Sequence, residues 1–497
     1  MVYTSTRNSG VKVPASQAIS EGISSEGGLF LPVSIPQLSV EDLKSLVKKN
    51  YVQRAEAVLS MYLTDFSAEE ISRCVSGAYA SGKFSDPEVA PLKKLYDNVH
   101  VLELWKGPTC AFKDMALQLL PYLLNVSAEK AVPGKEIVIL VATSGDTGKA
   151  ALEGFKDVAG TKIMVFYPDR GVSPMQKLQM TTQEGANVAV CAIEGNFDDA
   201  QNGVKAIFTD KALGERLKEK NAMFSSANSI NWGRLVPQIV YYISAYCDLV
   251  AKKNINLGDK INIVVPTGNF GNILAAYYAK KMGVPVNKLI CASNSNNVLT
   301  EFIKTGTYDS RRRFYTTISP SMDILVSSNL ERLLYLLADM DDAYIKSLMN
   351  GLVTKGSYNV SQGVEEKIKD SFAAGYCDDG QTKETIARTF KNRGYLCDTH
   401  TAVAVKVYED YRHETGDGTP AVIASTASPF KFSASVLEAL NPSAVGEDEF
   451  EMLKTLEELT GVNCPHQLKG LEEKKIRFDN CCATGDMKNA VLEMLGI

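Results

Sequence analysis

The feature that most constrains the fold is an alternation of short apolar runs with helix-like stretches, which begins near residue 135. Runs rich in β-branched and aromatic residues occupy 137–141, 162–167 and 187–193, and a helix-like stretch that ends at Val158 separates the first two. Short runs of this kind, separated by helices of about 10–15 residues, are typical of a parallel sheet that is covered on both faces. The sequence therefore predicts an α/β fold.

The alternation resumes after a long amphipathic stretch. A helix is predicted over 234–252, followed by a buried strand over 261–266 and a helix over 272–282. A late apolar run at 421–425 is expected to return to this second sheet. Residues 320–395 have helical periodicity, so we expect a helical addition there.

The two ends of the sequence differ from this pattern. Gly- and Ser-rich turns near 24–28 and helical patterns over 39–80 predict a separate N-terminal domain over 1–100. The segment after Pro442 is charged and is expected to be helical.

Composition excludes several classes of protein. With 497 residues, 45% hydrophobic and 22% charged, the chain has enough apolar material for a folded protein of more than one domain. Its 53 Lys and Arg against 58 Asp and Glu give a net charge of −5 without a long basic tract, so we expect no nucleic-acid partner. No apolar run approaches the ~20 residues that span a bilayer, and no secretory signal is recognisable, which predicts a cytoplasmic protein without membrane contact.

The spacing of cysteine and histidine argues against a metal site. The ten cysteines show no Cys-x-x-Cys spacing, and the four histidines are not placed as in His-Glu-x-x-His. We therefore expect no metal-dependent chemistry. The sequence leaves open whether the protein is a monomer or a homodimer.

Two segments at strand-to-helix junctions can bind an anion. In Pro-Thr-Gly-Asn-Phe-Gly-Asn at 266–272, glycines let backbone N–H groups approach a phosphate near a helix N-terminus. In Ala-Thr-Ser-Gly-Asp-Thr-Gly at 142–148, hydroxyl and N–H groups can hold a carboxylate or a phosphate. Taken singly, the first is also compatible with an ordinary turn and the second with a helix cap.

A third segment, at 107–118, carries Lys113 in the first turn of a predicted helix, beside Phe112 and Met115. A lysine is normally a solvated surface residue. If this one is buried, desolvation lowers the pKa of its amine and makes it a nucleophile that can form a Schiff base.

A fourth segment, at 424–432, follows the predicted strand over 421–425 and is rich in hydroxyl groups. Ser425 or Thr426 can hydrogen-bond a heteroaromatic nitrogen. The alternative is that these residues cap a helix that begins near Ser433.

Together and in this order, the four segments resemble the threonine synthase family, which are fold-type-II enzymes dependent on pyridoxal phosphate (PLP). The likeness is to the longer fungal and enterobacterial-type group and covers nearly the whole chain. A further matching segment is Asn-Ser-Ile-Asn-Trp-Gly-Arg at 228–234. Several such segments in register are far more specific than any one of them.

The resemblance implies a fold similar to that of the tryptophan synthase β subunit, with two α/β domains and the cofactor in the cleft between them. The N-terminal domain would then comprise 1–100. The large PLP-binding domain would comprise 101–135 and 233–497, and the small α/β domain 136–232.

The resemblance also implies roles for individual residues. Lys113 would hold PLP as a Schiff base and move protons during catalysis. The cofactor phosphate would be held by Gly268, Asn269, Phe270 and Asn272, and the pyridine nitrogen would be contacted by Thr426. Weaker candidates for substrate binding are Ser144, Asp146, Thr147, Asn231 and Arg234.

The family reaction converts O-phospho-L-homoserine and water to L-threonine and phosphate. Two positions depart from the family pattern, because Lys106 and Ser428 stand where a histidine is usual. Lys106 can instead supply positive charge to a substrate phosphate. These departures keep two alternatives open, a related phospho-lyase that releases 2-oxobutyrate and a catalytically silent paralogue that binds a metabolite.

Overall fold

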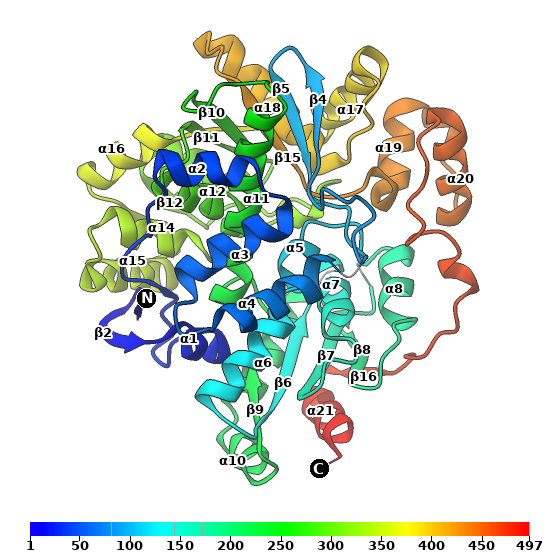
Figure 1. The fold of residues 1–497 in the computed structure, drawn as a ribbon. Helices are drawn as coiled ribbons and strands as arrows, with labels where there is room; N and C mark the ends of the chain where they lie inside the picture. The colour runs from blue at the N-terminus through cyan, green and yellow to red at the C-terminus, as the bar shows by residue number, and fades with distance from the viewer. Residues whose placement is uncertain (81, 144, 171, 497) are drawn as a thin grey trace.

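Two sheets organise the fold, and Figure 1 shows them in the upper and lower halves of the molecule. The computed structural model describes residues 1–80, 82–143, 145–170 and 172–496. The larger sheet has six strands in the order β14 (Phe372–Tyr376), β11 (Val286–Ser293), β10 (Ile261–Pro266), β15 (Ala421–Ser425), β5 (Val99–Glu103) and β4 (Leu92–Tyr96). The smaller has five in the order β16 (Cys481–Ala483), β8 (Val188–Glu194), β7 (Thr161–Pro168), β6 (Glu136–Ala142) and β9 (Ala222–Ser225). The predicted α/β class is confirmed.

The strands of both sheets run parallel, apart from β4, which is antiparallel to β5. In the larger sheet Val264 of β10 pairs with Ile290 and Ile423 on its two neighbours. These side chains belong to the apolar cluster of helix α18 (Thr399–Thr415) on one face of the sheet. The alternate residues Ile263 and Val422 belong to the main core cluster. Because helices cover both faces, these strands are apolar without interruption.

Helix α11 (Trp232–Ala251) lies in the middle of the main core. It contacts α2 (Val40–Val47), α3 (Tyr51–Tyr62), α5 (Asp114–Leu117) and α12 (Gly271–Lys281). Every residue from Trp232 to Cys247 is buried. The helix predicted over 234–252 is therefore present. The expectation that it is amphipathic, with one face left to solvent, is wrong, because neighbouring helices cover it on several sides.

The N-terminal residues form a small sheet and four α-helices, of which α1 (Ala15–Glu21) lies between the second and third strands of the chain. The antiparallel order is β2 (Asn8–Val13), β1 (Tyr3–Ser5) and β3 (Phe30–Pro32). Helices α2, α3 and α4 (Ala68–Val75) follow, and each begins with a capping box. The helical patterns predicted over 39–80 are confirmed.

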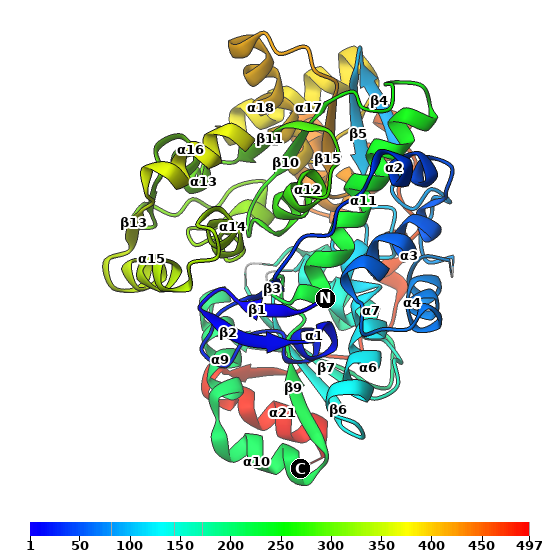
Figure 2. The ribbon, with the colours of Figure 1, turned by 60° about the vertical axis from the view of Figure 1, so that its left-hand side comes forward.

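The remaining helices cover the sheets or extend from them. They are α6 (Leu120–Ala131), α7 (Asp146–Phe155), α8 (Pro174–Thr181), α9 (Phe197–Thr209), α10 (Lys211–Glu219), α13 (Val298–Thr305), α14 (Leu330–Leu337), α15 (Asp342–Lys355), α16 (Gln362–Ser371), α17 (Asp379–Arg393), α19 (Ser433–Leu440), α20 (Glu449–Thr460) and α21 (Met487–Leu495). Strands β12 (Thr307–Asp309) and β13 (Ser357–Asn359) pair separately. Figure 2 shows α14, α15 and β13 projecting to one side of the larger sheet.

Two expectations about the C-terminal half need correction. The segment 320–395 is not wholly helical, because it contains β14, an edge strand of the larger sheet. The segment after Pro442 is not wholly helical either, because β16 joins the smaller sheet beside β8. Both strands are short and contain mostly small residues, so neither shows the β-branched pattern that predicted the central strands.

The sheets also suggest boundaries that differ from the expected ones. Strand β4 belongs to the larger sheet although it precedes residue 101, and β16 belongs to the smaller sheet although it follows residue 233. Figure 1 shows the chain after α20 descending to β16 and α21. We propose that the large domain begins with β4 and that the C-terminal segment completes the small domain.

Among the residues that the structure describes, no helix combines the length and apolarity needed to cross a membrane.

Candidate functional site

Three neighbouring parallel strands bring the main candidate residues to one edge of the larger sheet. Strands β5, β15 and β10 are adjacent, so their carboxyl ends lie side by side. Lys113 follows β5, Thr426 follows β15, and the loop 268–272 follows β10. The carboxyl ends of parallel strands are the usual place for ligands in α/β folds.

Lys113 lies at the N-terminus of α5, with its side chain only 12% exposed. Its Nζ atom lies 3.5 Å from Ser321 Oγ and 3.9 Å from Asp146 Oδ2. Burial lowers the pKa of the Lys113 amine, while the charge of Asp146 acts in the opposite direction. A buried amine that loses its proton more readily is a suitable nucleophile for a carbonyl carbon.

The turn before Lys113 is closed by Asp114. Its two carboxylate oxygens accept hydrogen bonds of 2.8 Å from the backbone N–H and the hydroxyl of Thr109. A Cβ atom on Gly107 would lie 2.5 Å from Asp114 Cβ, so the turn requires a glycine there. Burial raises the pKa of Asp114 to about 7, although the Thr109 hydrogen bonds oppose this.

Thr426 is brought next to Lys113 by the backbone. Its carbonyl oxygen accepts a hydrogen bond of 2.8 Å from the N–H of Phe112. Ala111 and Ala427 form an isolated β-bridge beside it. The buried Thr426 and the lysine therefore belong to two chain segments that are hydrogen-bonded to each other.

The loop after β10 has the backbone of an anion site. Phe270 adopts the left-handed conformation (φ 61°) directly before α12. Ser327 Oγ donates to the Gly268 carbonyl at 2.8 Å, and Asn329 donates to the Asn269 carbonyl through its backbone and its side chain, both at 3.1 Å. These hydrogen bonds to its carbonyl groups fix the conformation of the loop. The loop lies at the N-terminus of an 11-residue helix, whose dipole favours an anion.

Asn272 offers a free donor at this loop. Its Oδ1 atom accepts hydrogen bonds from the hydroxyls of Tyr241, at 2.7 Å, and Tyr242. Its Nδ2 atom is buried and finds no partner among the described residues. A buried N–H donor without a partner is costly, so this position fits a ligand with acceptor oxygens such as a phosphate.

Asp146 and Lys431 form an ion pair that the sequence did not predict. Lys431 Nζ lies 2.6 Å from Asp146 Oδ1 and donates to the Thr109 carbonyl at 3.1 Å. Gln176 also donates to Asp146 Oδ1, at 3.2 Å. Burial tends to raise the pKa of Asp146, but the charges of Lys431 and Lys113 outweigh it and hold that pKa well below its ordinary value. The fourth segment contained Lys431, yet nothing in the sequence distinguished it from a surface lysine.

The other weaker candidates differ in what they can contact. Asn231 is fully buried, donates to the carbonyls of Ile19 and Ser226 and accepts from the Gly233 N–H, so its side chain is used within the protein. Thr147 lies half-buried in the first turn of α7. Ser144 lies outside the described residues.

Arg234 is a buried guanidinium on α11. Its Nη1 atom donates to the Ala227 carbonyl at 2.5 Å, and its Nε atom finds no partner within the described part of the chain. Burial lowers its pKa to about 10, and its charge is one of those that lower the pKa of Lys113. The arginine is therefore close enough to influence the site.

The two positions without a histidine are both occupied by residues with partners in the protein. Lys106 Nζ lies 2.9 Å from Glu103 Oε2 and 3.8 Å from the centre of the Trp105 ring. Ser428 is buried and accepts a hydrogen bond from the Phe430 N–H. The charge of Lys106 is therefore already paired with a carboxylate.

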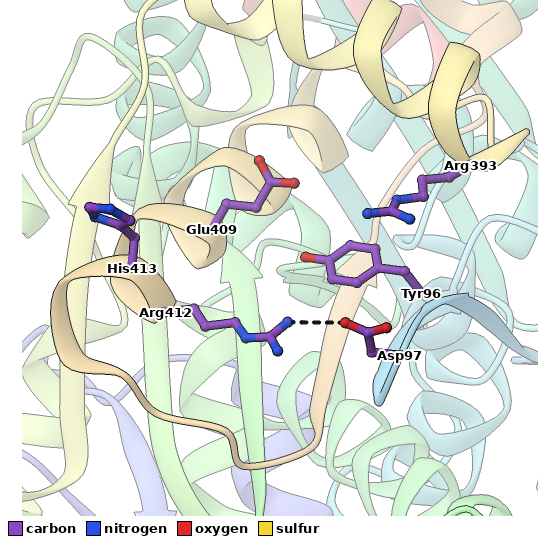
Figure 3. A pocket seen from close by; sticks show the side chains of 6 residues that line it. All are labelled: Tyr96, Asp97, Arg393, Glu409, Arg412 and His413. Carbon is purple, nitrogen blue, oxygen red and sulfur yellow. Dashed lines mark ion pairs between the residues drawn. The ribbon is translucent and has the colours of Figure 1, made fainter.

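A surface pocket of about 400 Å³ lies elsewhere. Figure 3 shows its lining residues Tyr96, Asp97, Arg393, Glu409, Arg412 and His413, with an ion pair between Arg412 and Asp97. It lies at the β4–β5 turn and the C-terminal end of α18, whereas Lys113 follows the opposite end of β5. It contains no lysine for a Schiff base. Among the described residues, no cluster of three or more potential ligands is placed to hold a metal ion.

Comparison with known proteins identifies the family. Residues 2–79 match the family described as threonine synthase N terminus, residues 88–426 match pyridoxal-phosphate dependent enzyme, and residues 401–491 match threonine synthase, C-terminal. Human threonine synthase-like 1 is 40% identical over 493 residues, which cover 97% of this chain. The chain spans only 65% of the length of that relative.

Two further matches extend over nearly the full length of both partners. Threonine synthase from Pseudomonas aeruginosa is 38% identical over 90% of this chain and 91% of that protein. The crystal structure of PLP-bound threonine synthase from Brucella melitensis has a TM-score of 0.88 and 37% identity, covering 99% of each chain. The resemblance and the cofactor inferred from the sequence are thereby confirmed. Since the buried lysine, the phosphate-type loop and the free Asn272 donor fit PLP as well, the chain belongs to the threonine synthase family of PLP-dependent enzymes with fold type II.

Proposed function

We propose that this protein is a threonine synthase, which converts O-phospho-L-homoserine and water to L-threonine and phosphate. One observation supports catalytic activity, in addition to membership of the family. The amine of Lys113 is buried with a lowered pKa where the anion-binding loop and Thr426 converge. A silent paralogue would need neither this amine nor the free donor of Asn272.

Each part of the cofactor has a counterpart in the chain. Lys113 would bind its aldehyde carbon, and the loop of Gly268, Asn269, Phe270 and Asn272 would hold its phosphate. Thr426 would contact the pyridine nitrogen. When bound, PLP supplies an electron sink for carbanion chemistry, and the protein supplies orientation and proton transfer.

Lys113 would also move the protons of the reaction. Because burial lowers its pKa, the amine gives up its proton more readily and is better able to act as a base. We assign it removal of the proton at Cα of the substrate and transfer of protons at Cβ. Asp146, at 3.9 Å, would stabilise the protonated amine between these transfers.

Arg234 is the strongest candidate for an anionic group of the substrate. It is buried, lacks a carboxylate partner among the described residues and has an unused Nε donor. A buried guanidinium in this state is well suited to a carboxylate or a phosphate. Asn231, whose hydrogen-bonding groups bind the protein itself, would orient the start of α11 rather than bind substrate.

A second candidate function is a phospho-lyase that uses the same substrate. It would release phosphate without completing the addition of water at Cβ, and hydrolysis would then give 2-oxobutyrate and ammonia. The observation behind this alternative is that neither Lys106 nor Ser428 replaces the proton-transfer chemistry of an imidazole.

Product analysis tests both functions. Purified protein is incubated with PLP and O-phospho-L-homoserine, inorganic phosphate is followed over time, and threonine and 2-oxobutyrate are separated by chromatography. We expect threonine in equal amount to phosphate. Phosphate with 2-oxobutyrate and ammonia would identify the phospho-lyase. No phosphate release from PLP-loaded protein would reject both.

A further inference from the structure

A short segment around Ser321 lies against both Lys113 and the anion-binding loop. Ser321 Oγ lies 3.5 Å from Lys113 Nζ, and the Ser321 carbonyl oxygen lies where it would be 2.6 Å from a Cβ atom on Gly268. This segment, 319–323, therefore touches both the lysine and the loop that would hold the cofactor phosphate. The position of this segment therefore affects the orientation of the Lys113 amine.

His400 is hydrogen-bonded to the backbone of this segment. Its Nε2 atom accepts a hydrogen bond of 3.2 Å from the backbone N–H of Ser321. Its Nδ1 atom lies 2.8 Å from Asp398 Oδ2, and its ring packs edge-on against Phe432. His400 and Asp398 are both buried. A continuous chain of contacts thus runs from Asp398 through His400 and Ser321 to Lys113.

The hydrogen bonds define which nitrogen of His400 carries a proton. An atom that accepts from a backbone N–H has no proton, so the ring proton is on Nδ1. Asp398 accepts that proton through Oδ2 and fixes the tautomer and the ring orientation. Asp398 also caps helix α18, where its carboxylate accepts from the N–H groups of His400 and Thr401.

The far end of the segment is held independently. Asp323 accepts hydrogen bonds from the side chains of Asn294, at 2.7 Å, and Thr317, at 2.8 Å. Weakening the contact of His400 therefore frees Ser321 while Asp323 keeps the segment attached. This separation makes the role of His400 measurable.

We propose that Asp398 and His400 are a positioning pair that holds Ser321 against Lys113 and so directs the lysine amine toward the cofactor. The inference rests on the proposed cofactor site but not on the identity of the substrate. Neither residue of the pair contacts the lysine directly, and both act through the backbone of Ser321.

The tautomer gives the sharpest test. Asp398→Ala removes the acceptor that fixes the proton on Nδ1, so the ring proton is free to move to Nε2. Nε2–H would then face the N–H of Ser321, and the hydrogen bond would be lost. We expect PLP binding to weaken about five- to tenfold, the value of one such hydrogen bond. The matched control is Asp341→Ala, which removes the cap of α15 away from the site, as Asp398→Ala removes that of α18.

The other variants separate positioning from stability. His400→Gln can place a carbonyl oxygen near the position of Nε2, so we expect it to retain most of the PLP affinity that His400→Leu loses. In the protein without PLP, the rate at which acetic anhydride modifies Lys113, followed by mass spectrometry, should change in Asp398→Ala and Ser321→Ala but not in Asp341→Ala. Thermal unfolding temperatures of all the variants, measured in parallel, separate a loss of folding stability from a loss of positioning.

Two results would overturn the proposal. One is an Asp398→Ala protein whose PLP affinity and Lys113 reactivity equal those of the parent chain. The other is an equal loss of PLP affinity in His400→Gln and His400→Leu that follows their loss of folding stability. Because PLP binding requires no O-phospho-L-homoserine, these results are independent of whether the protein makes threonine.

Discussion

Lys431 Nζ lies 2.6 Å from Asp146 Oδ1, and this buried ion pair connects the regions of the two sheets. Lys431 follows β15 of the larger sheet, and Asp146 begins α7 after β6 of the smaller sheet. The second oxygen of the same carboxylate lies 3.9 Å from Lys113 Nζ. One carboxylate therefore stands between two buried amines, and its charge is shared between the structural and the reactive lysine.

Removing Lys431 should affect both stability and the reactive amine. Lys431→Met leaves Asp146 buried without its nearest cation, and breaking a buried pair in this way costs about 3–5 kcal/mol. It also removes a positive charge that lowers the pKa of Lys113, so that pKa should rise. Urea unfolding and the pH dependence of Lys113 acetylation measure the two effects.

The matched control for this variant is Lys383→Met. Lys383 pairs with Glu438 at 2.6 Å on the surface, and a surface pair contributes no more than about 1 kcal/mol. Equal losses in the two variants would contradict the special role of the buried pair. So would a Lys113 pKa that does not change in Lys431→Met.

Asp114 gives a prediction for the pH dependence of stability. Its pKa is about 7 in the folded protein and near its ordinary value when unfolded. Between these values the folded state binds a proton that the unfolded state has lost, so stability falls as the pH rises from about 4 to about 7. Asp114→Asn cannot titrate, and its stability relative to the parent chain should increase over this range. The urea midpoints of the parent chain and of Asp114→Asn at pH 5 and pH 8 measure this relative stability. A difference between the two proteins that is the same at both pH values would contradict the prediction.

Lys113 carries the prediction for activity. Lys113→Ala removes the only amine that the proposal places at the cofactor aldehyde, so reduction with borohydride should no longer attach PLP to the chain. Phosphate release from O-phospho-L-homoserine should fall below detection. Lys130→Ala, which removes a lysine paired with Glu70 on the surface, should keep both properties. Near-normal turnover by Lys113→Ala would defeat the assignment.

Much of the candidate site could be predicted from the sequence because each of its parts lies within one short segment. The loop 266–272 and the turn around Lys113 each lie in one strand-to-helix junction, where glycine and hydroxyl residues have a direct physical meaning. The central strands could be predicted for the same reason, since apolar runs such as 261–266 need no partner to be recognised.

The missed features depend on contacts between distant segments. Lys431 is buried because it meets Asp146, 285 positions earlier in the sequence, and such pairing leaves no local signal. His400 was excluded as a metal ligand, but its contact with Ser321 could not be foreseen from spacing. Strand β16 exists because β8 offers an open edge to Cys481 and its neighbours.

Asn272 should act on the phosphate and not on the rest of the cofactor. In Asn272→Asp the hydroxyls of Tyr241 and Tyr242 can still donate to one oxygen, but the free donor becomes a negatively charged acceptor. PLP affinity should therefore fall more than about tenfold, whereas affinity for pyridoxal, which lacks the phosphate, should change little. Fluorescence titration with both compounds measures this. Equal losses for the two would show that the residue supports the fold instead.

Gly268 should be intolerant of even one added methyl group. A Cβ atom there would lie 2.6 Å from the carbonyl oxygen of Ser321, which is backbone and cannot rotate away. Gly268→Ala should therefore push segment 319–323 from the loop, weaken PLP binding and lower the unfolding temperature. Gly214→Ala is the matched control, because a Cβ atom in that helical position meets nothing within 4 Å. Alanine is also the better helix former by about 1 kcal/mol, so the control should be slightly stabilised. If both variants bound PLP like the parent chain, the close approach of the two segments would have no part in holding the cofactor.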